Sequence, residues 1–362
     1  MAADVAVNDR MAGGRSRPAG AGIAGGATGR RPTSVVRAPP GIGSMTHHDV
    51  FNGDADGLLA LHQLRLAEPR ESVLVTGLKR DVALVGRVDA RPGDSVSVFD
   101  VSLGANRDAV VALLERGVSV RYFDHHFAGD PIAHPAFESH IDTSPGVCSG
   151  ILVDRYLGGA QRPWAIAAAF GDNLHGQART LAASRGLDGR DADALCELGE
   201  CLAYNAYGDC DADVVIAPAA MYRTLAPHAD PFAFMRDEPV FARIREARRD
   251  DLARARTIAP QLVARGGSVY TLPDAAWSRR VRGALANDLA QAHPDRAHAI
   301  LTPSPTGGYV ASVRAPLASP TGADRLCRTF ASGGGRAAAA GVNHLRADEI
   351  PLFVDRFRQA YP

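Results

Sequence analysis

The sequence predicts a two-lobed α/β protein, in which a doubly wound parallel sheet is followed by a smaller α/β C-terminal domain. Its 362 residues exceed one ordinary domain, and 46% of them are hydrophobic, which is enough to bury sizeable cores. From Met45 onward, short apolar segments alternate with segments of helical periodicity, as a parallel sheet with crossover helices requires. A charged stretch then precedes a second series of strands, which indicates a second lobe.

The first lobe is expected to contain four strands with helices between and after them. Runs rich in β-branched and aromatic residues predict strands at residues 48–52, 72–76, 95–100 and 118–123. Apolar residues at helical spacing predict helices at residues 57–66, 107–115, 147–156, 164–172 and 191–204. Alternation of this kind is typical of a sheet with helices on both faces.

The second half begins with a charged stretch at residues 239–263, which we interpret as a solvated helix linking two lobes. Strands are predicted at residues 268–271, 299–302 and 309–313. A glycine-rich turn is expected to lead into a helix at 332–340, and an amphipathic helix at 348–359 to end the chain. The predicted domains are therefore residues 45–238 and 264–362, joined by the linker 239–263.

The first 44 residues differ in composition from the rest. They hold nine glycines, four prolines and no aromatic residue, so they could not offset their ordering entropy by burial. We expect a disordered tail or an over-extended gene start, with a transit peptide or basic arm as the alternative. No function is assigned to this segment.

Charge and hydropathy exclude two classes of protein. Forty basic residues balance forty acidic ones, and residues 45–362 alone carry 34 basic and 38 acidic side chains, so no basic excess exists to coat a long polyanion. No run approaches the roughly 18 apolar residues that a membrane span needs, and a compact signal-peptide core is lacking. These features favour a cytoplasmic protein with no membrane partner.

The cysteine pattern argues against a disulfide framework. The five cysteines are odd in number, scattered and without the C-x-x-C spacing of zinc or redox sites. We expect buried or partly buried reduced thiols.

Charged and metal-binding side chains follow all four predicted strands of the first lobe. In chain order they are Asp54 and Asp56, Lys79 and Arg80, Asp100, and the run Asp124-His125-His126. Taken singly, each has an ordinary explanation as a turn or a helix cap. At one sheet edge, however, crowded aspartates would repel one another unless a cation neutralised them. Carboxylate and imidazole groups together suit Mn²⁺, Mg²⁺ or a related divalent ion.

Four motifs resemble those of the DHH phosphoesterase superfamily, in the same order. They are residues 52–57 (Asn-Gly-Asp-Ala-Asp-Gly), 98–100 (Val-Phe-Asp), 123–126 (Phe-Asp-His-His) and 170–172 (Phe-Gly-Asp). Residues 332–341 (Ser-Gly-Gly-Gly-Arg-Ala-Ala-Ala-Ala-Gly) resemble the glycine motif of the DHH-associated C-terminal domain of RecJ-type exonucleases, nano-RNases and cyclic-dinucleotide phosphodiesterases. The resemblance covers residues 45–362 and implies a DHH catalytic domain followed by a substrate-binding domain.

The resemblance implies a phosphoesterase with two divalent cations in a cleft between the lobes, Mn²⁺ foremost and Mg²⁺ or Co²⁺ as alternatives. Carried over by motif, the metal ligands are Asp54, Asp56, Asp100, His125 and Asp172. Asp100 would bridge both ions. His126 would face the substrate phosphate, and Asp124 would orient the histidines.

The chain departs from the family at one position on the metal side, where the first metal would have fewer protein ligands or be weakly held, and at one position on the substrate side. Several members have histidine where this chain has Val50, four residues before Asp54, and histidine where it has Arg336, after the three glycines. A glycine-rich turn at a helix N-terminus would still offer N–H groups to a phosphate, and an arginine adds a fork-shaped donor. The expected substrate-binding residues are Lys79, Arg80, Arg314, Gly333, Gly334, Gly335 and Arg336.

Several nearby polar residues have other interpretations. His47 and His48 are interpreted as surface residues, and Asn343 and His344 either line the cleft or are structural. Lys79 and Arg80 either steady the phosphate or pair with the aspartates.

These features predict hydrolysis of phosphodiester bonds in a short oligonucleotide or a dinucleotide, by a protein that could act as a homodimer. A RecJ-like exonuclease on single-stranded DNA is the alternative enzyme, and a pyrophosphatase a weaker one. A nucleotide sensor that has lost catalysis, which Val50 and Arg336 would favour, is the non-enzymatic alternative.

Overall fold

The computed structural model describes residues 45–362. The predicted tail 1–44 lies outside the described residues. Within them, no helix combines the length and the apolar character needed to cross a membrane.

A five-stranded parallel sheet forms the first half of the described chain, in the order β2-β1-β3-β4-β5. Its strands are β1 (His47–Asn52), β2 (Val73–Gly77), β3 (Ser95–Phe99), β4 (Ser119–Asp124) and β5 (Phe137–Ile141). The direction of winding reverses between β1 and β3, and ligands of open α/β sheets bind at the carboxyl ends of strands beside such a reversal. The edge strand β5 was missed because it alternates too weakly between apolar and polar residues.

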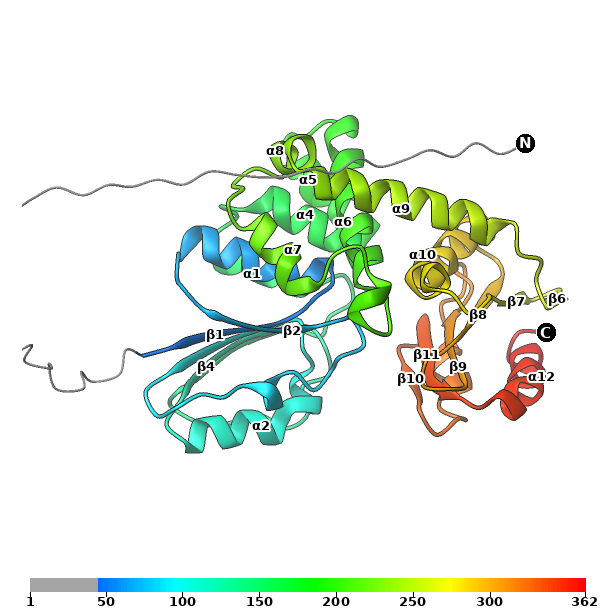
Figure 1. Cartoon of the computed structure of the whole chain (residues 1–362), viewed down its shortest axis with the longest axis horizontal. Helices are drawn as coiled ribbons and strands as arrows, with labels where there is room; N and C mark the ends of the chain where they lie inside the picture. Colours follow the sequence, from blue (N-terminus) through cyan, green and yellow to red (C-terminus); the bar gives the residue numbers. More distant parts are fainter. Residues whose placement is uncertain (1–44) are drawn as a thin grey trace, which may run out of the picture. The chain divides into compact units, whose positions relative to one another are not determined.

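Helices cover both faces of this sheet, as predicted (Figure 1). Phe51, Phe99 and Phe123 project toward α1 (Ala55–Ala67), while Val98 projects to the opposite face, toward α2 (Leu103–Glu115). Alternate residues of a strand point to opposite faces, so one run of apolar residues supplies both cores.

A helical layer follows the sheet and packs on the α1 side (Figure 1). Its helices are α3 (Ser149–Tyr156), α4 (Arg162–Gly171), α5 (His175–Ser184), α6 (Gly189–Ala206), α7 (Pro218–Leu225), α8 (Pro231–Asp237) and α9 (Pro239–Arg256). The predicted linker helix corresponds to α9, but it is not solvated all round, because Phe241, Ile244 and Leu252 are buried. The predicted domain boundaries stay a prediction.

A second, six-stranded sheet follows α9, in the order β10-β11-β9-β8-β7-β6. Its strands are β6 (Leu262–Ala264), β7 (Gly267–Thr271), β8 (Ala297–Pro303), β9 (Tyr309–Arg314), β10 (Gly333–Gly335) and β11 (Ala339–Leu345). Only β7 and β8 pair in parallel. They are joined by α10 (Ala276–Ala292), which packs on Ile300 of β8. Leu301 faces the other core, with α11 (Ala323–Cys327) and α12 (Ile350–Ala360).

The glycine motif does not precede a helix, so the prediction for residues 332–340 is wrong. The three glycines form β10, and β11 pairs Ala340 with Val313 of β9. The alanines suggested a helix, but helix propensity is a weak preference that backbone pairing with β9 overrides.

Two further predictions are corrected by burial. His47 and His48 are not surface residues, since they are 6% and 4% exposed in β1, a central strand covered on both faces. Of the five cysteines, all free, Cys148, Cys201 and Cys327 are buried and Cys196 is partly buried, but Cys210 is exposed.

Candidate metal centre

The predicted metal ligands meet at the carboxyl edge of the first sheet. Asp54 caps the N-terminus of α1 just after β1, and Asp100 follows β3 directly. His125 follows β4, and Asp172 is the residue after α4. Parallel pairing and the winding reversal between β1 and β3 explain why residues more than a hundred positions apart lie together.

Backbone N–H groups fix the two aspartates of the first motif. Asp54 Oδ1 accepts from the N–H groups of Asp56 (3.0 Å) and Gly57 (3.2 Å) in the first turn of α1. The two oxygens of Asp56 accept from Ser149 and Gly150 at the N-terminus of α3, each at 2.8 Å. A helix N-terminus favours a negative charge, so α3 holds Asp56 in a set orientation. Sequence reasoning missed Gly150, although the Pro145-Gly146 pair signalled a helix start nearby.

The His125 ring lies at the centre of the cluster. Its Nε2 lies 3.3 Å from Asp100 Oδ1, 3.8 Å from Asp56 Oδ2 and 3.9 Å from Asp172 Oδ2. All four side chains are almost completely buried, with at most 10% exposed. One imidazole nitrogen is therefore shared among three carboxylates.

Hydrogen bonds to Asp124 fix the positions of His125 and His126. Its Oδ1 accepts from the N–H groups of His125 (2.8 Å) and His126 (3.1 Å) and lies 2.8 Å from His126 Nδ1. Its Oδ2 accepts from the Leu103 N–H of α2. The side chain of His126 remains 37% exposed, so its ring borders the buried cluster and solvent.

Burial and crowding shift the acidity of the cluster. Burial, and then the charge of Asp100, raises the pKa of Asp56 to about 7. Burial followed by Asp54 likewise raises the pKa of Asp100. Burial alone would lower the pKa of His125, but the hydrogen bond and charge of Asp100 outweigh it and raise that pKa to about 10. The carboxylates thus favour a positive charge among them.

Backbone strain is concentrated beside the cluster. Among the described residues, the non-glycine residues with positive φ are Asp100 (55°) and Asn173 (64°). Each such residue costs about 1–3 kcal/mol, and this strain is found most often at functional sites. One of these residues is a predicted ligand, and the other follows Asp172.

The donor set fits a divalent cation. Asp172 Oδ2 is buried and has no hydrogen-bond partner, which is costly for a carboxylate oxygen unless a ligand completes it. Burial is the main reason why the pKa of Asp172 is raised. Carboxylate oxygens with one imidazole are a ligand set for Mg²⁺ or Mn²⁺. Asp54, Asp56, Asp100, His125 and Asp172 are the residues that could hold such ions.

The two basic residues after β2 behave differently. The Lys79 ammonium pairs with Asp54 and outweighs burial, so the pKa of Asp54 is lowered. Arg80 does not contact the aspartates of the cluster and instead donates to Asp209 (3.1 Å) and Asn343 Oδ1 (2.8 Å). Lys79 therefore faces the cluster, whereas Arg80 joins this edge to β11.

The predicted contacts of the second sheet lie at different distances from the cluster. Arg336 is exposed in the β10–β11 turn, with Nη2 4.0 Å from Asp172 Oδ2. Gly333, Gly334 and Gly335 form β10, so the expected grip by a helix N-terminus is absent here. Arg314 donates to Asn287 Oδ1 (2.8 Å) of α10 and makes no contact with the aspartates.

Val50 stands where several family members have a histidine. Val50 is completely buried in the core on the α2 side of the sheet. Asn52 does not take over as a ligand, because its side chain shapes the loop: Oδ1 accepts from the Asp54 N–H, and Nδ2 donates to Lys79 O.

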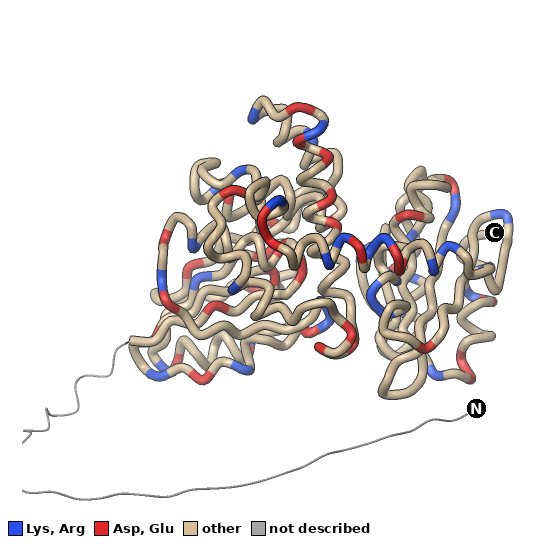
Figure 2. Tube along the Cα trace, turned by 45° about the horizontal axis from the view of Figure 1, so that its top comes forward, with Lys and Arg blue, Asp and Glu red and all other residues tan. Residues whose placement is uncertain are grey.

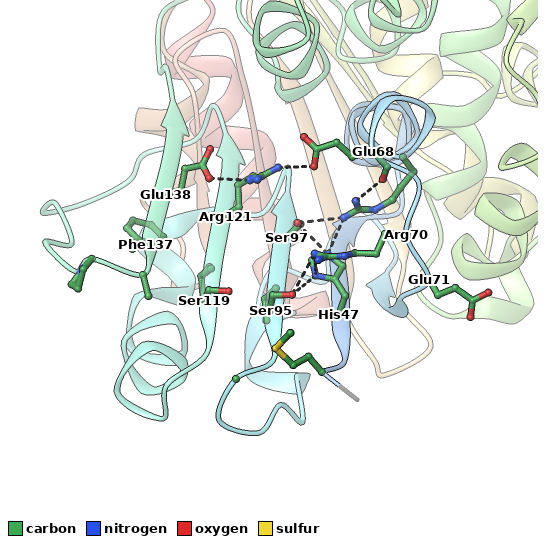
Figure 3. Close-up of a pocket in the computed structure, with 17 residues that line it drawn as sticks. His47, Glu68, Arg70, Glu71, Ser95, Ser97, Ser119, Arg121, Phe137 and Glu138 are labelled. Carbon is green, nitrogen blue, oxygen red and sulfur yellow. Dashed lines mark hydrogen bonds and ion pairs between the residues drawn. The ribbon is translucent and has the colours of Figure 1, made fainter. Parts of the chain in front are cut away.

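A cavity of about 710 Å³ lies away from the aspartates, at the amino ends of β1, β3 and β4 (Figure 3). Two of its three arginines are already paired with carboxylates, since Arg65 binds buried Asp49, and Arg121 binds Glu68 and Glu138. The third, Arg70, lies 3.1 Å from His47 Nδ1. This internal neutralisation makes the cavity a weaker candidate for phosphate than the aspartate cluster.

No protein-family model and no curated protein sequence matches the chain. Solved structures do match. The exonuclease RecJ bound to manganese aligns with a TM-score of 0.59 and 18% identity, over 88% of this chain and 91% of that one. RecJ from Thermus thermophilus in complex with Mn²⁺ gives 0.58 and 18% over 88% of this chain, which spans about half (52%) of that protein.

A third structure shares the same architecture. The pGpG-specific phosphodiesterase PggH from Vibrio cholerae aligns with a TM-score of 0.51 and 14% identity, over 87% of this chain and 99% of that one. At these identities the likeness concerns the fold. The predicted two-lobed α/β class, with a parallel sheet followed by a second α/β unit, is confirmed.

Proposed function

We propose that this chain is a metal-dependent phosphodiesterase that hydrolyses short oligonucleotides or dinucleotides with the help of two divalent cations, Mn²⁺ foremost. The observation that carries the proposal is the convergence of Asp56, Asp100 and Asp172 on one imidazole nitrogen, while the buried Oδ2 of Asp172 accepts no hydrogen bond. Divalent cations would neutralise the negative charges that these buried carboxylates bring together. When bound, the two ions supply Lewis acidity, which acidifies water and offsets charge on the phosphate.

Different residues of the chain would bind the metal ions, orient His126 and bind the phosphate. Asp54, Asp56, Asp100, His125 and Asp172 would hold the ions, with Asp100 between them. Asp124 keeps the His126 ring at the border of the cluster, where it can donate a hydrogen bond to a phosphate oxygen. Lys79 and Arg336 flank the cluster from two sides and would bind the phosphate.

A short substrate suits the charge distribution. Acidic and basic residues are interspersed along the described trace, and no long run of basic residues is seen in it (Figure 2). Aromatic residues make up only 6% of the sequence, too few for a platform that stacks many bases. We further propose that the protein acts in the cytoplasm, and a homodimer stays a prediction.

A RecJ-like exonuclease acting on single-stranded DNA is the second candidate. The likeness to RecJ over most of both chains favours it. The two candidates differ in the length of nucleic acid that must bind, and hence in salt dependence.

The test is hydrolysis by the purified protein, loaded with Mn²⁺, of pGpG, pApA, cyclic dinucleotides, short RNA, single-stranded DNA and pyrophosphate side by side. We expect the highest kcat/KM on a dinucleotide or short RNA, with a shallow dependence on salt. A preference for long single-stranded DNA would favour the exonuclease. Release of phosphate from pyrophosphate alone would refute the phosphodiesterase. No turnover with metal bound would favour the sensor.

A further inference from the structure

A second group of metal-binding side chains lies outside the aspartate cluster. It consists of His175, the first residue of α5, and of Cys196 and Glu200, which lie one turn apart on α6. All three are partly buried, and their ligand atoms lie within 4.8 Å of one another. None of the three belongs to the motifs of the predicted catalytic site.

The spacing of the three side chains matches a tetrahedral ion. Cys196 Sγ lies 3.9 Å from His175 Nδ1 and 3.6 Å from Glu200 Oε1. Bonds of about 2.3 Å to sulfur and about 2.0–2.1 Å to nitrogen or oxygen, at tetrahedral angles, place neighbouring ligand atoms roughly 3.5 Å apart. The two separations from the sulfur therefore require adjustments of only a few tenths of an ångström, and the nitrogen and oxygen lie within 4.8 Å of each other.

The surroundings support a bound cation. Arg248 donates to Glu200 Oε2 at 2.7 Å, which orients the carboxylate and leaves Oε1 toward the cysteine. A small cavity of about 40 Å³, large enough for a water molecule, is lined by His175 and Glu200. A thiolate and a carboxylate would bring two negative charges to a divalent ion, and Arg248 shares the charge of the carboxylate.

We propose that His175, Cys196 and Glu200 bind Zn²⁺ at a site separate from the catalytic metals. One sulfur, one imidazole nitrogen and one carboxylate oxygen are ligands for Zn²⁺, whereas Mg²⁺ and Ca²⁺ prefer oxygen alone. Binding releases the thiol proton of Cys196 to solvent. This set of ligands does not need a C-x-x-C motif, because two ligands come from α6 and the third, His175, comes from α5.

The site ties α5 to α6 next to the catalytic edge. Asp172 and His175 are separated only by Asn173, which has a positive φ, and by Leu174. A metal bond at His175 would restrain the turn that presents Asp172. The ion is thus structural and positions a predicted ligand without touching substrate.

Cobalt spectroscopy tests the site directly. Co²⁺ replaces Zn²⁺ and shows a near-ultraviolet charge-transfer band only when a thiolate is bound. The predicted catalytic ligands contain no sulfur. We expect the full-length, metal-stripped protein titrated with Co²⁺ to develop the band, Zn²⁺ to bleach it, and Cys196→Ser to lose it.

Two matched variants control for two of the four other thiols. Cys148 lies beside Asp56 and Cys210 is exposed, so Cys148→Ser and Cys210→Ser must both keep the band. His175→Ala should weaken Co²⁺ binding at least tenfold, and it provides a second reading if Cys196→Ser fails to fold. Absence of the band in the wild type, or its persistence in Cys196→Ser, overturns the proposal. Loss of the band in Cys148→Ser but not in Cys196→Ser would also overturn the proposal.

Discussion

At the scale of single residues, Asp56 and Asp100 are held in positions that are unfavourable for a carboxylate charge without a cation. Asp100 combines burial, a left-handed backbone and a close carboxylate neighbour in Asp54. Each of these features costs free energy, and no compensating hydrogen bond to Asp172 Oδ2 exists among the described residues. Binding of metal would offset these costs, which is why we assign function to this edge of the sheet.

Asp100→Asn should abolish metal-dependent turnover while leaving the protein folded. Changes behind a metal ligand cost roughly 10–100-fold, so replacing a bridging ligand should cost more than about 100-fold in kcat. Initial rates with Mn²⁺ and far-ultraviolet circular dichroism measure the two effects.

The matched control for Asp100 is Asp142→Asn. Asp142 also follows a strand of the same sheet, β5, but its carboxylate accepts from the Ser144 N–H and from Arg155. This variant should keep wild-type turnover. Equal losses in both variants, or wild-type activity in Asp100→Asn, would contradict the assignment of the bridging ligand.

The buried side chain of His62 should make the free energy of unfolding depend on pH. Burial lowers the pKa of this histidine to about 4, and its Nε2 lies 2.8 Å from His228 O. The unfolded chain binds a proton near pH 6.5, so the contribution of His62 to the free energy of unfolding should fall by up to about 3 kcal/mol as the pH falls from 6.5 to 4. Urea unfolding across this range should show a smaller loss for His62→Gln.

The control is the exposed His344→Gln, which should keep the wild-type slope. His298, whose pKa burial also lowers to about 4, changes stability in the same direction, so part of the slope should remain in His62→Gln. An unchanged slope in that variant would argue against a neutral buried His62.

At the scale of elements, the β10–β11 hairpin carries the glycine motif to the edge of the catalytic cluster. Its three glycines have unequal roles. A Cβ on Gly333 would lie 1.7 Å from Cys327 O, whereas a Cβ on Gly334 meets nothing within 4 Å. Packing therefore requires the first glycine, and the space beside the second is free for a substrate.

Alanine at these two positions should separate folding from binding. Gly333→Ala should destabilise the protein by about 1–3 kcal/mol, because the chain must shift to relieve the clash. Gly334→Ala should leave Tm unchanged and raise KM. Thermal melts and steady-state kinetics on the best substrate check both. Equal Tm losses, or an unchanged KM in Gly334→Ala, would refute this division.

At the scale of the whole molecule, metal should stabilise the fold. Four buried aspartates share one edge, and a ligand that binds only the folded state stabilises it by about 2.7 kcal/mol at a hundred times its Kd. Mn²⁺ should therefore raise Tm by several degrees, and EDTA should reverse the change.

Differential scanning calorimetry of the full chain measures this shift, with Asp100→Asn as the comparison. Most of the Mn²⁺-dependent increase should disappear in that variant. An equal increase in both proteins would place the bound ions elsewhere.

Much of the fold could be predicted because local patterns suffice for it. The four strands that precede the charged motifs carry apolar residues near their carboxyl ends, and α1 and α2 were recognised by their spacing. Several elements were missed: β5 is half exposed, and α5, α7 and α10 begin without a capping side chain. The short helix α8 was missed as well. The glycine hairpin was misassigned since its structure depends on pairing with β9.

The sequence alone determined the order of the motifs and which residues end parallel strands, and strand direction then brings those ends to one edge. Tertiary structure decided what local patterns do not encode: that α3 donates two N–H groups to Asp56, and that Asp172 is left with an unpartnered oxygen. It also brought His175 to Cys196 from a separate helix. These contacts join residues distant in the chain, and only packing fixes the distances between them.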